Sequence, residues 1–209
     1  MKTLMVIRYA AWTILAALAF LTAAIALGWW RVDGPGRAQT DGGVEIKGLP
    51  QIGGPFTLVN QHGKIVSNKD FLGKPKLVFF GFTHCPDVCP TTLFEITTRL
   101  QKLGTEASDL QVLFITADPE RDTPEQLALY LQSFDPRIVA LTGTQEQVDA
   151  AVLAYKAYAK KVPSEGGGYT MDHTASVFLM DRNDRFMGLI DYHEQEASAL
   201  AKMRRLIAK

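Results

Sequence analysis

Two cysteines could carry chemistry in this chain of 209 residues, which has no others. Three residues separate Cys85 from Cys89, in the sequence Cys-Pro-Asp-Val-Cys. Thiolates attack disulfides, form disulfides and bind metal ions. The thioredoxin motif has only two intervening residues, and a zinc site made of two cysteine pairs would need a second pair. The cysteines alone therefore leave open a redox site, a metal site, a structural disulfide or two inert buried thiols.

The residues around the cysteines predict a strand, a tight loop and a helix. Leu77–Phe82 is almost wholly apolar and rich in β-branched and aromatic residues, which is typical of a strand buried on both faces. Pro90 suits the first position of a helix, and apolar residues then recur at helical spacing to Leu103, before Gly104. The cysteines should therefore lie at the carboxyl edge of a sheet and the amino end of a helix. Unpaired N–H groups and the helix dipole there favour thiolates.

Strands and helices alternate in the rest of the chain, which predicts an α/β domain with a parallel core. Capping patterns at Thr123 and Thr144 begin two helices, and the second is expected to reach about Lys160. A turn at Arg182–Asp184 predicts a closing hairpin of antiparallel strands. The expected strands are 56–59, 64–66, 110–117, 138–141, 175–180 and 185–190, and a last helix is expected over 194–208.

Tyr9–Trp30 is an uncharged run of 22 residues, long enough to span a hydrocarbon core about 30 Å thick. Trp29 and Trp30 lie where interfacial aromatic residues are common. The run exceeds the apolar region of about 7–15 residues in a signal peptide, so we expect a retained anchor rather than a cleaved signal. The predicted organisation is a short tail (1–8), a transmembrane anchor (9–30), a Gly-rich polar tether (31–52) and one domain (53–209).

The whole chain carries 22 basic and 22 acidic residues. Residues 1–30 contain Lys2 and Arg8 and no acid, so the remainder has a net charge of about −2. Nothing in this composition suggests a nucleic-acid surface.

Three motifs point to one family. Gly81–Pro90 reads Gly-Phe-Thr-His-Cys-Pro-Asp-Val-Cys-Pro, Asp118–Pro124 reads Asp-Pro-Glu-Arg-Asp-Thr-Pro, and Gly168–Ser176 reads Gly-Tyr-Thr-Met-Asp-His-Thr-Ala-Ser. Together they resemble the Sco/SenC family, the copper-handling proteins of cytochrome c oxidase assembly. The resemblance covers roughly Gly53–Asp191. The order of elements, with the cysteine loop after a central strand, resembles a thioredoxin-like fold.

By this resemblance, Cys85, Cys89 and His173 are the copper ligands. We also predict that Cys85 and Cys89 can form a reversible disulfide, with some adjustment of the loop, because helical i, i+4 spacing lies near the upper end of the Cα range for disulfides. Two thiolates and one imidazole suit Cu(I) and could also hold Cu(II), while zinc remains possible on ligand type alone. His173 would otherwise be an ordinary loop histidine. Asp87 and Asp172 are candidates to orient the ligands, although either could be a solvated acid.

Other polar residues near these motifs carry weaker predictions. His84 could tune Cys85 or serve as an auxiliary ligand, whereas His62 and His193 are expected to be solvated. Residues Asp118–Asp122 follow a strand at the same sheet edge as the cysteines. They are expected to form either a rim that docks a partner or a charged turn.

The resemblance implies a membrane-anchored copper metallochaperone that helps assemble the dinuclear copper centre (CuA) of cytochrome c oxidase. Its expected partners are oxidase subunit II and another periplasmic copper chaperone. The expected location is the bacterial inner membrane, with a single pass and the soluble domain in the periplasm. The alternative is an enzyme, a thiol-disulfide reductase that keeps the copper-site cysteines of subunit II reduced. A peroxiredoxin-type peroxidase would fit the fold, but the sequence shows no evident arginine beside the cysteine loop to activate a peroxide.

Overall fold

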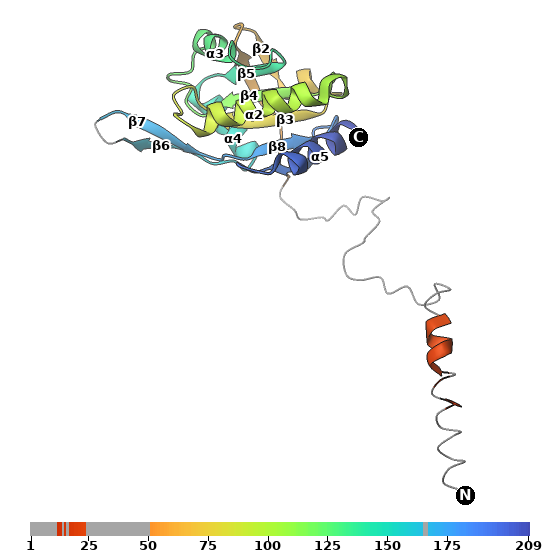
Figure 1. Ribbon diagram of the computed structural model, residues 1–209. Coiled ribbons are helices and arrows are strands. Elements are labelled where there is room, and N and C mark those ends of the chain that lie inside the picture. The colour runs from red at the N-terminus through yellow and green to blue at the C-terminus, as the bar shows by residue number, and fades with distance from the viewer. Residues whose placement is uncertain (1–11, 14, 16, 24–50, 165–166) are drawn as a thin grey trace, which may run out of the picture. The chain divides into compact units, whose positions relative to one another are not determined.

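The computed structural model describes residues 12–13, 15, 17–23, 51–164 and 167–209 (Figure 1). The chain divides into two units, Met1–Gly48 and Leu49–Lys209. In the first unit the described residues 17–23 are helical. The predicted tail, residues 9–11, 14, 16 and 24–30 of the predicted anchor, and residues 31–50 of the tether lie outside the described residues. Within the described part of the chain, no helix combines the length and the apolar character needed to cross a membrane.

A seven-stranded sheet forms the centre of the second unit, in the order β2-β1-β5-β4-β3-β8-β9. Its parallel pairs are β3 with β4 and β4 with β5, and the other neighbours are antiparallel. The strands are β1 (Thr57–Asn60), β2 (Ile65–Ser67), β3 (Lys76–Gly81), β4 (Gln111–Thr116), β5 (Ile138–Thr142), β8 (Val177–Met180) and β9 (Phe186–Ile190). This arrangement confirms the predicted α/β domain with a parallel core and a closing hairpin.

Side chains of the central strands enter two apolar cores, one on each face of the sheet, because successive residues of a strand point in opposite directions. Phe79 packs in a core with residues of α2 (Val88–Leu103), α3 (Pro124–Leu131) and α5 (Glu196–Ile207). Its neighbour Phe80 packs in the other core, with residues of α4 (Gln145–Ala154). Two short 3-10 helices lie in connections, η1 (Asn68–Phe71) between β2 and β3 and η2 (Gly104–Ala107) between α2 and β4. The strand that precedes the cysteines is thus fixed on both sides.

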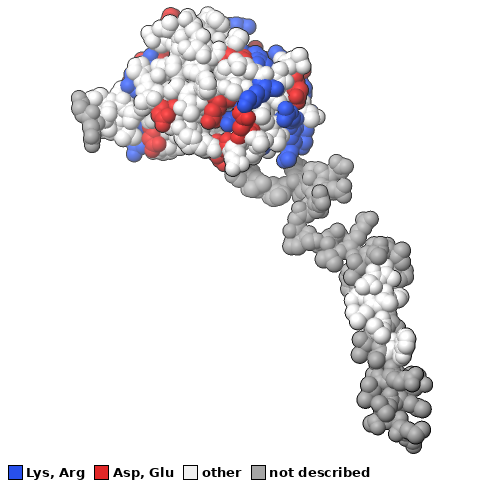
Figure 2. Space-filling view, viewed as in Figure 1, with Lys and Arg blue, Asp and Glu red and all other residues white. Residues whose placement is uncertain are grey.

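Charged side chains line the exposed margins of the helices. Basic residues at the end of α5 lie beside acidic ones in Figure 2, and Lys102 and Arg204 form ion pairs with Glu196 and Glu106. Exposed pairs of this kind contribute at most about 1 kcal/mol each. The buried apolar face of α5, rather than these pairs, therefore holds the helix against the sheet.

The predicted helix from Thr144 to about Lys160 is wrong in its second half, since α4 ends at Ala154. The N–H groups of Lys156 and Ala157 donate to the carbonyls of Leu153 and Val152, and Lys156 adopts a left-handed conformation with φ 54°. This is the Schellman pattern of helix termination. The chain then forms β6 (Ala159–Pro163), which pairs with β7 (Tyr169–His173) in a separate antiparallel hairpin. Figure 1 shows this hairpin extending away from the main sheet.

Gly81 is the last residue of β3, and its Cα lies close to side chains of two other segments. A Cβ atom added there would lie 2.6 Å from Cε2 of Phe114 and 2.8 Å from Sγ of Cys89. Glycine therefore allows the buried thiol to lie directly against the strand.

We expect Gly81→Ala to lower the free energy of unfolding by about 1–3 kcal/mol, because the added methyl group overpacks the core. Gly54→Ala is the matched control, since its Cβ would meet only an ordinary contact at 3.4 Å. Denaturant unfolding measures both variants. Equal unfolding midpoints for Gly81→Ala and the wild type would show that the site can accommodate a methyl group.

Candidate metal centre

The two cysteines lie at the junction of β3 and α2, as predicted, but α2 begins at Val88 rather than at Pro90. Pro90 is tolerated at the third helical position because N–H groups of the first turn have no partner within the helix. Cys89 therefore lies inside the first turn of α2 and is fully buried, whereas Cys85 lies in the preceding loop and is partly exposed.

His173 is the last residue of β7, a segment distant in sequence from the cysteine loop, and it contacts the cysteines. Its Nε2 atom lies 3.4 Å from Sγ of Cys89. Its ring packs edge-on against Phe79 and Phe82, with ring centroids 6.1 and 5.7 Å apart. One donor atom from each of Cys85, Cys89 and His173 lies within 4.8 Å of the others. The fold thus brings together three side chains that are distant in sequence.

A backbone hydrogen bond sets the orientation of the imidazole. Nδ1 of His173 lies 3.0 Å from the carbonyl oxygen of Thr174. A carbonyl only accepts hydrogen bonds, so Nδ1 carries the proton and donates it. This leaves Nε2, on the side of the sulfur atoms, as the ring nitrogen that can bind a metal. The residue that orients His173 is therefore Thr174, through its backbone, and not the predicted Asp172.

The two thiols have opposite protonation tendencies. A hydrogen bond from Cys89 lowers the pKa of Cys85 far below its ordinary value, and contacts with the N–H groups of Cys89 and Asp87 act in the same direction. Cys89 has a raised pKa, first because its hydrogen bond to Cys85 favours the thiol and second because the group is buried. The sequence predicted a thiolate at both positions. These opposite shifts favour a thiolate at Cys85 and a protonated thiol at Cys89.

The site opens into a hollow of about 200 Å³ beside the donor atoms. Cys85 and His173 line it together with apolar atoms of Pro86, Val88 and Met171. The hollow gives a partner's side chain or an ion access to Cys85, while Cys89 remains in the core behind it.

The remaining candidate residues lie around the site rather than in it. The exposed ring of His84 is hydrogen-bonded to the hydroxyl of Thr83 at 3.1 Å, and His84 is not part of the three-residue donor cluster. Asp87 is exposed, and its carboxylate accepts a hydrogen bond from Thr91. Asp172 is exposed at the rim of the hollow.

The two other histidines lie away from this cluster. His62 is exposed in the turn between β1 and β2, as predicted. His193 is also exposed, as predicted, and its ring centroid lies 3.8 Å from that of Tyr192.

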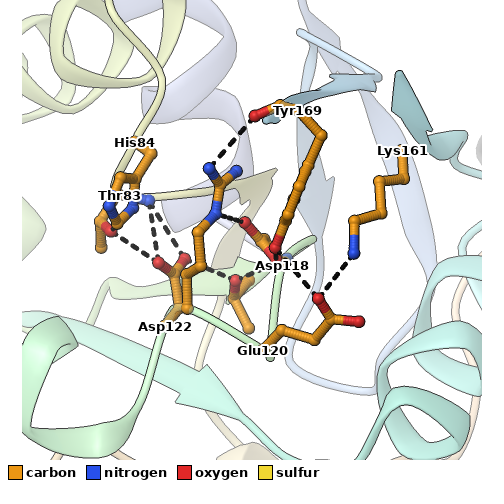
Figure 3. A network of polar contacts seen from close by, with 9 residues as sticks. Thr83, His84, Asp118, Glu120, Asp122, Lys161 and Tyr169 are labelled. Atoms are coloured by element: carbon orange, nitrogen blue, oxygen red, sulfur yellow. Dashed lines mark hydrogen bonds and ion pairs between the residues drawn. The ribbon is translucent and has the colours of Figure 1, made fainter. Parts of the chain in front are cut away.

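The segment after β4 forms a turn at residues 119–121, as one of the two alternatives expected, but two of its acidic residues are not solvated. Asp118 and Asp122 are only 2% and 0% exposed, so their carboxylates face inward. Figure 3 shows Asp122 joined to Thr83 and Asp118 joined to Tyr169. The closely spaced charged residues of this segment suggest a solvated turn. Its position after a strand next to β3 was the signal that could have indicated contacts with the cysteine loop.

Comparisons with known proteins agree with this geometry. The SCO1/SenC family model matches residues 44–208. The human mitochondrial SCO1 homologue is 39% identical over 159 residues, which cover 75% of this chain and 53% of that protein. The SenC protein of Rhodobacter capsulatus is 39% identical over 149 residues, covering 71% of this chain and 66% of that one. The chain thus spans about half the length of the human relative.

Solved structures of Sco proteins match the fold of this chain. ScoI of Bradyrhizobium japonicum with copper bound is 48% identical, with a TM-score of 0.69, and the match covers 74% of this chain and 99% of that one. BsSco, described as a Sco-family protein of cytochrome c oxidase assembly with a disulfide switch, is 27% identical with a TM-score of 0.62, covering 77% and 95% of the two chains. These matches confirm the predicted thioredoxin-like α/β fold.

Proposed function

Because the chain belongs to the SCO1/SenC family, we propose that it binds one copper ion through Cys85, Cys89 and His173 and helps to assemble the CuA centre of cytochrome c oxidase. The observation that carries this proposal is the convergence of the three donor atoms within 4.8 Å. The hydrogen bond that Nδ1 of His173 donates to the carbonyl of Thr174 supports it, because it leaves Nε2 free to bind a metal. Copper is the cargo of such a protein.

The donor set fits copper chemically. Thiolate sulfur is a soft ligand that selects Cu(I), and imidazole is compatible with both oxidation states. The separation of 3.4 Å between Sγ of Cys89 and Nε2 of His173 can be bridged by one ion with metal–ligand bonds of about 2.0–2.3 Å. Binding requires Cys89 to lose its proton, so copper loading should release a proton.

Metal analysis of the purified protein tests the copper site. The reduced protein should retain about one equivalent of copper, because both sulfur atoms are available as ligands. The protein oxidised to a Cys85–Cys89 disulfide should retain far less. Copper retention that is equal before and after oxidation would refute ligation by the two sulfurs.

We also propose that residues 9–30 anchor the protein in the bacterial inner membrane, with the copper domain in the periplasm. The support is the uncharged run of 22 residues between Arg8 and Arg31, which matches the length of a membrane-spanning helix of about 20 residues. Mass measurement of the mature protein from a membrane fraction should give the full chain. A chain that begins after Ala26 and remains in the soluble fraction would show a cleaved signal peptide.

Oxidase subunit II is the target that we propose, with another periplasmic copper chaperone as the source of the metal. The hollow beside Cys85 supports a direct transfer, because it leaves one sulfur ligand accessible while the second stays buried. Mixing the copper-loaded protein with the apo copper domain of subunit II should move copper to that domain. Retention of all copper by the donor would contradict the transfer.

The difference between the two thiols favours a second candidate function, the reduction of disulfides. The Cys85 thiolate would attack one sulfur of a target disulfide, forming a mixed disulfide and releasing the other target sulfur as a thiolate. Cys89 would then lose its proton and attack Sγ of Cys85, releasing the second target sulfur. The target gains two electrons, and the Cys85–Cys89 pair becomes a disulfide.

Alkylation tests the predicted order of reactivity. The lowered pKa of Cys85 should keep its reaction rate with iodoacetamide nearly constant from about pH 8 down to about pH 5, where an ordinary thiol with a pKa near 8.5 is almost unreactive. Mass spectrometry of the modified peptides should find the label on Cys85 before Cys89. A rate that rises steadily to about pH 8.5 would show that Cys85 is an ordinary thiol.

A further inference from the structure

The loop between β4 and α3 contacts both segments that provide the candidate copper ligands. Because β4 lies beside β3 in parallel register, this loop leaves the sheet next to the cysteine loop. It contains two adjacent charged residues, Arg121 and Asp122, and Figure 3 shows Asp122 beside Thr83 of the cysteine loop. Asp122 contacts the cysteine loop, and Arg121 contacts the hairpin that ends in His173.

Asp122 binds the cysteine loop through an unusually buried carboxylate. The residue is 0% exposed. Its oxygen atoms accept hydrogen bonds from the hydroxyl of Thr83 at 2.6 Å, the N–H of Thr83 at 3.1 Å and the hydroxyl of Thr116 at 2.6 Å. Burying a carboxylate is costly when its partners are amide and hydroxyl groups rather than a cation. The contact therefore fixes the chain two residues before Cys85 and ties it to the end of β4.

Arg121 binds the hairpin. Its Nη1 donates to the carbonyl of Tyr169 at 3.2 Å, and its guanidinium lies 3.9 Å from the centre of the Tyr169 ring. Its Nε pairs with Asp118, and the hydroxyl of Tyr169 donates to the same carboxylate at 2.9 Å. Tyr169 begins the strand that ends in His173, so these contacts fix the direction of β7 relative to the sheet. A stacked, hydrogen-bonded guanidinium suits this role because it is planar and rigid.

We infer that Arg121 and Asp122 are positioning residues of the copper site, which set the distance between the cysteine loop and His173. This inference rests on the proposed copper site. Neither residue belongs to the donor cluster. Each acts through a neighbouring segment, Asp122 through Thr83 and Arg121 through Tyr169. Loss of either contact allows one ligand segment to move relative to the other, which weakens a site whose three donors must meet at one ion.

Paired substitutions at Thr83 test the cysteine half of the inference in the full-length protein. Thr83→Val removes the hydroxyl donor but keeps the branched shape, whereas Thr83→Ser keeps the hydroxyl. We expect Thr83→Val to weaken Cu(I) binding in a chelator competition by about 10–100-fold and to shift the thiolate-to-copper absorption of the Cu(II) form. Thr83→Ser should match the wild type. Wild-type affinity and spectrum in Thr83→Val, or an equal loss in Thr83→Ser, would overturn this half.

A stability control separates positioning from a general loss of packing. Thr116→Val removes the other hydroxyl bonded to Asp122 and an acceptor for the N–H of Asp118. It should therefore lower the unfolding midpoint at least as much as Thr83→Val does. Its copper affinity should nevertheless stay closer to that of the wild type, because Thr83 still holds Asp122. If Thr83→Val and Thr116→Val instead lost copper affinity in proportion to the fall in their unfolding midpoints, Asp122 would have only a structural role. That result would overturn the inference.

Arg121→Lys tests the hairpin half. Lysine keeps a positive charge beside Asp118 but loses the donor to the Tyr169 carbonyl and the flat stacking surface. Copper binding should weaken, while the thiol-disulfide equilibrium of Cys85 and Cys89 should stay unchanged, since His173 takes no part in the disulfide. Unchanged copper affinity, or an equal effect on both measurements, would contradict the assignment of Arg121.

The same disulfide equilibrium separates failure of this inference from failure of the proposed function. A wild-type protein that binds no copper would refute the function. Thr83→Val should still shift the Cys85–Cys89 equilibrium against glutathione, because Thr83 fixes the loop that carries Cys85, and Thr83→Ser should not. An unshifted equilibrium in Thr83→Val would overturn the cysteine half whether or not copper binds.

Discussion

Replacement of Cys89 by serine is expected to abolish both copper binding and disulfide formation while leaving the fold intact. Cys89 is fully buried, and its sulfur accepts a hydrogen bond from the N–H of Phe82 at 3.4 Å. A serine hydroxyl is slightly smaller and can accept the same bond. It is a poor ligand for Cu(I), however, which prefers soft sulfur donors. The loss in copper affinity should exceed the roughly 10–100-fold that changes beside a metal ligand commonly cause.

Thr92→Val is a suitable control for this variant. Thr92 lies on the same helix as Cys89 and is 4% exposed, and its hydroxyl oxygen has no hydrogen-bond partner among the described residues. Copper affinity by chelator competition and unfolding midpoint should both stay near the wild-type values. If Cys89→Ser retained copper at wild-type affinity, Cys85 and His173 would have to hold the ion with a different third ligand.

The sequence predicted the elements that hold the cysteines because their signals are local. The apolar run before Gly81 predicts a strand, and the periodic apolar residues after Pro90 predict a helix. The predicted helix start was late by two residues, since Pro90 is acceptable anywhere in the first turn. The family motif added His173, which periodicity alone would have left as a loop histidine.

Other features could not be predicted because they depend on tertiary contacts. The end of α4 uses Lys156 in a left-handed conformation, where glycine or asparagine would have been the recognisable signal. The hairpin of β6 and β7 was missed for this reason. The different protonation of Cys85 and Cys89 arises from their contact with each other, which spacing does not reveal. Asp122 was expected at the surface, because an acidic residue is almost never fully buried.

Replacement of His173 by alanine should separate the two proposed functions. The imidazole supplies the nitrogen donor, and its ring fills space against Phe79 and Phe82. We expect copper binding to weaken by at least about 10–100-fold, which is the range found when a residue that contacts a metal ligand, rather than the ligand itself, is replaced. Disulfide formation between Cys85 and Cys89 needs only the two sulfurs, so thiol counting should still find two reactive groups after reduction and none after mild oxidation.

Three measurements on this variant distinguish the chaperone from the reductase: copper affinity, reduction of a target disulfide, and oxidase assembly in cells. His62→Ala is the matched control, since His62 is exposed in a turn. Loss of copper binding and oxidase assembly with disulfide reduction preserved would favour the chaperone, because only the metal site needs the imidazole. Normal oxidase assembly by a variant that reduces disulfides but no longer binds copper would favour the reductase. Unchanged copper affinity would exclude His173 as a ligand and, with it, the main physical reason for preferring a copper carrier to a thioredoxin-like reductase.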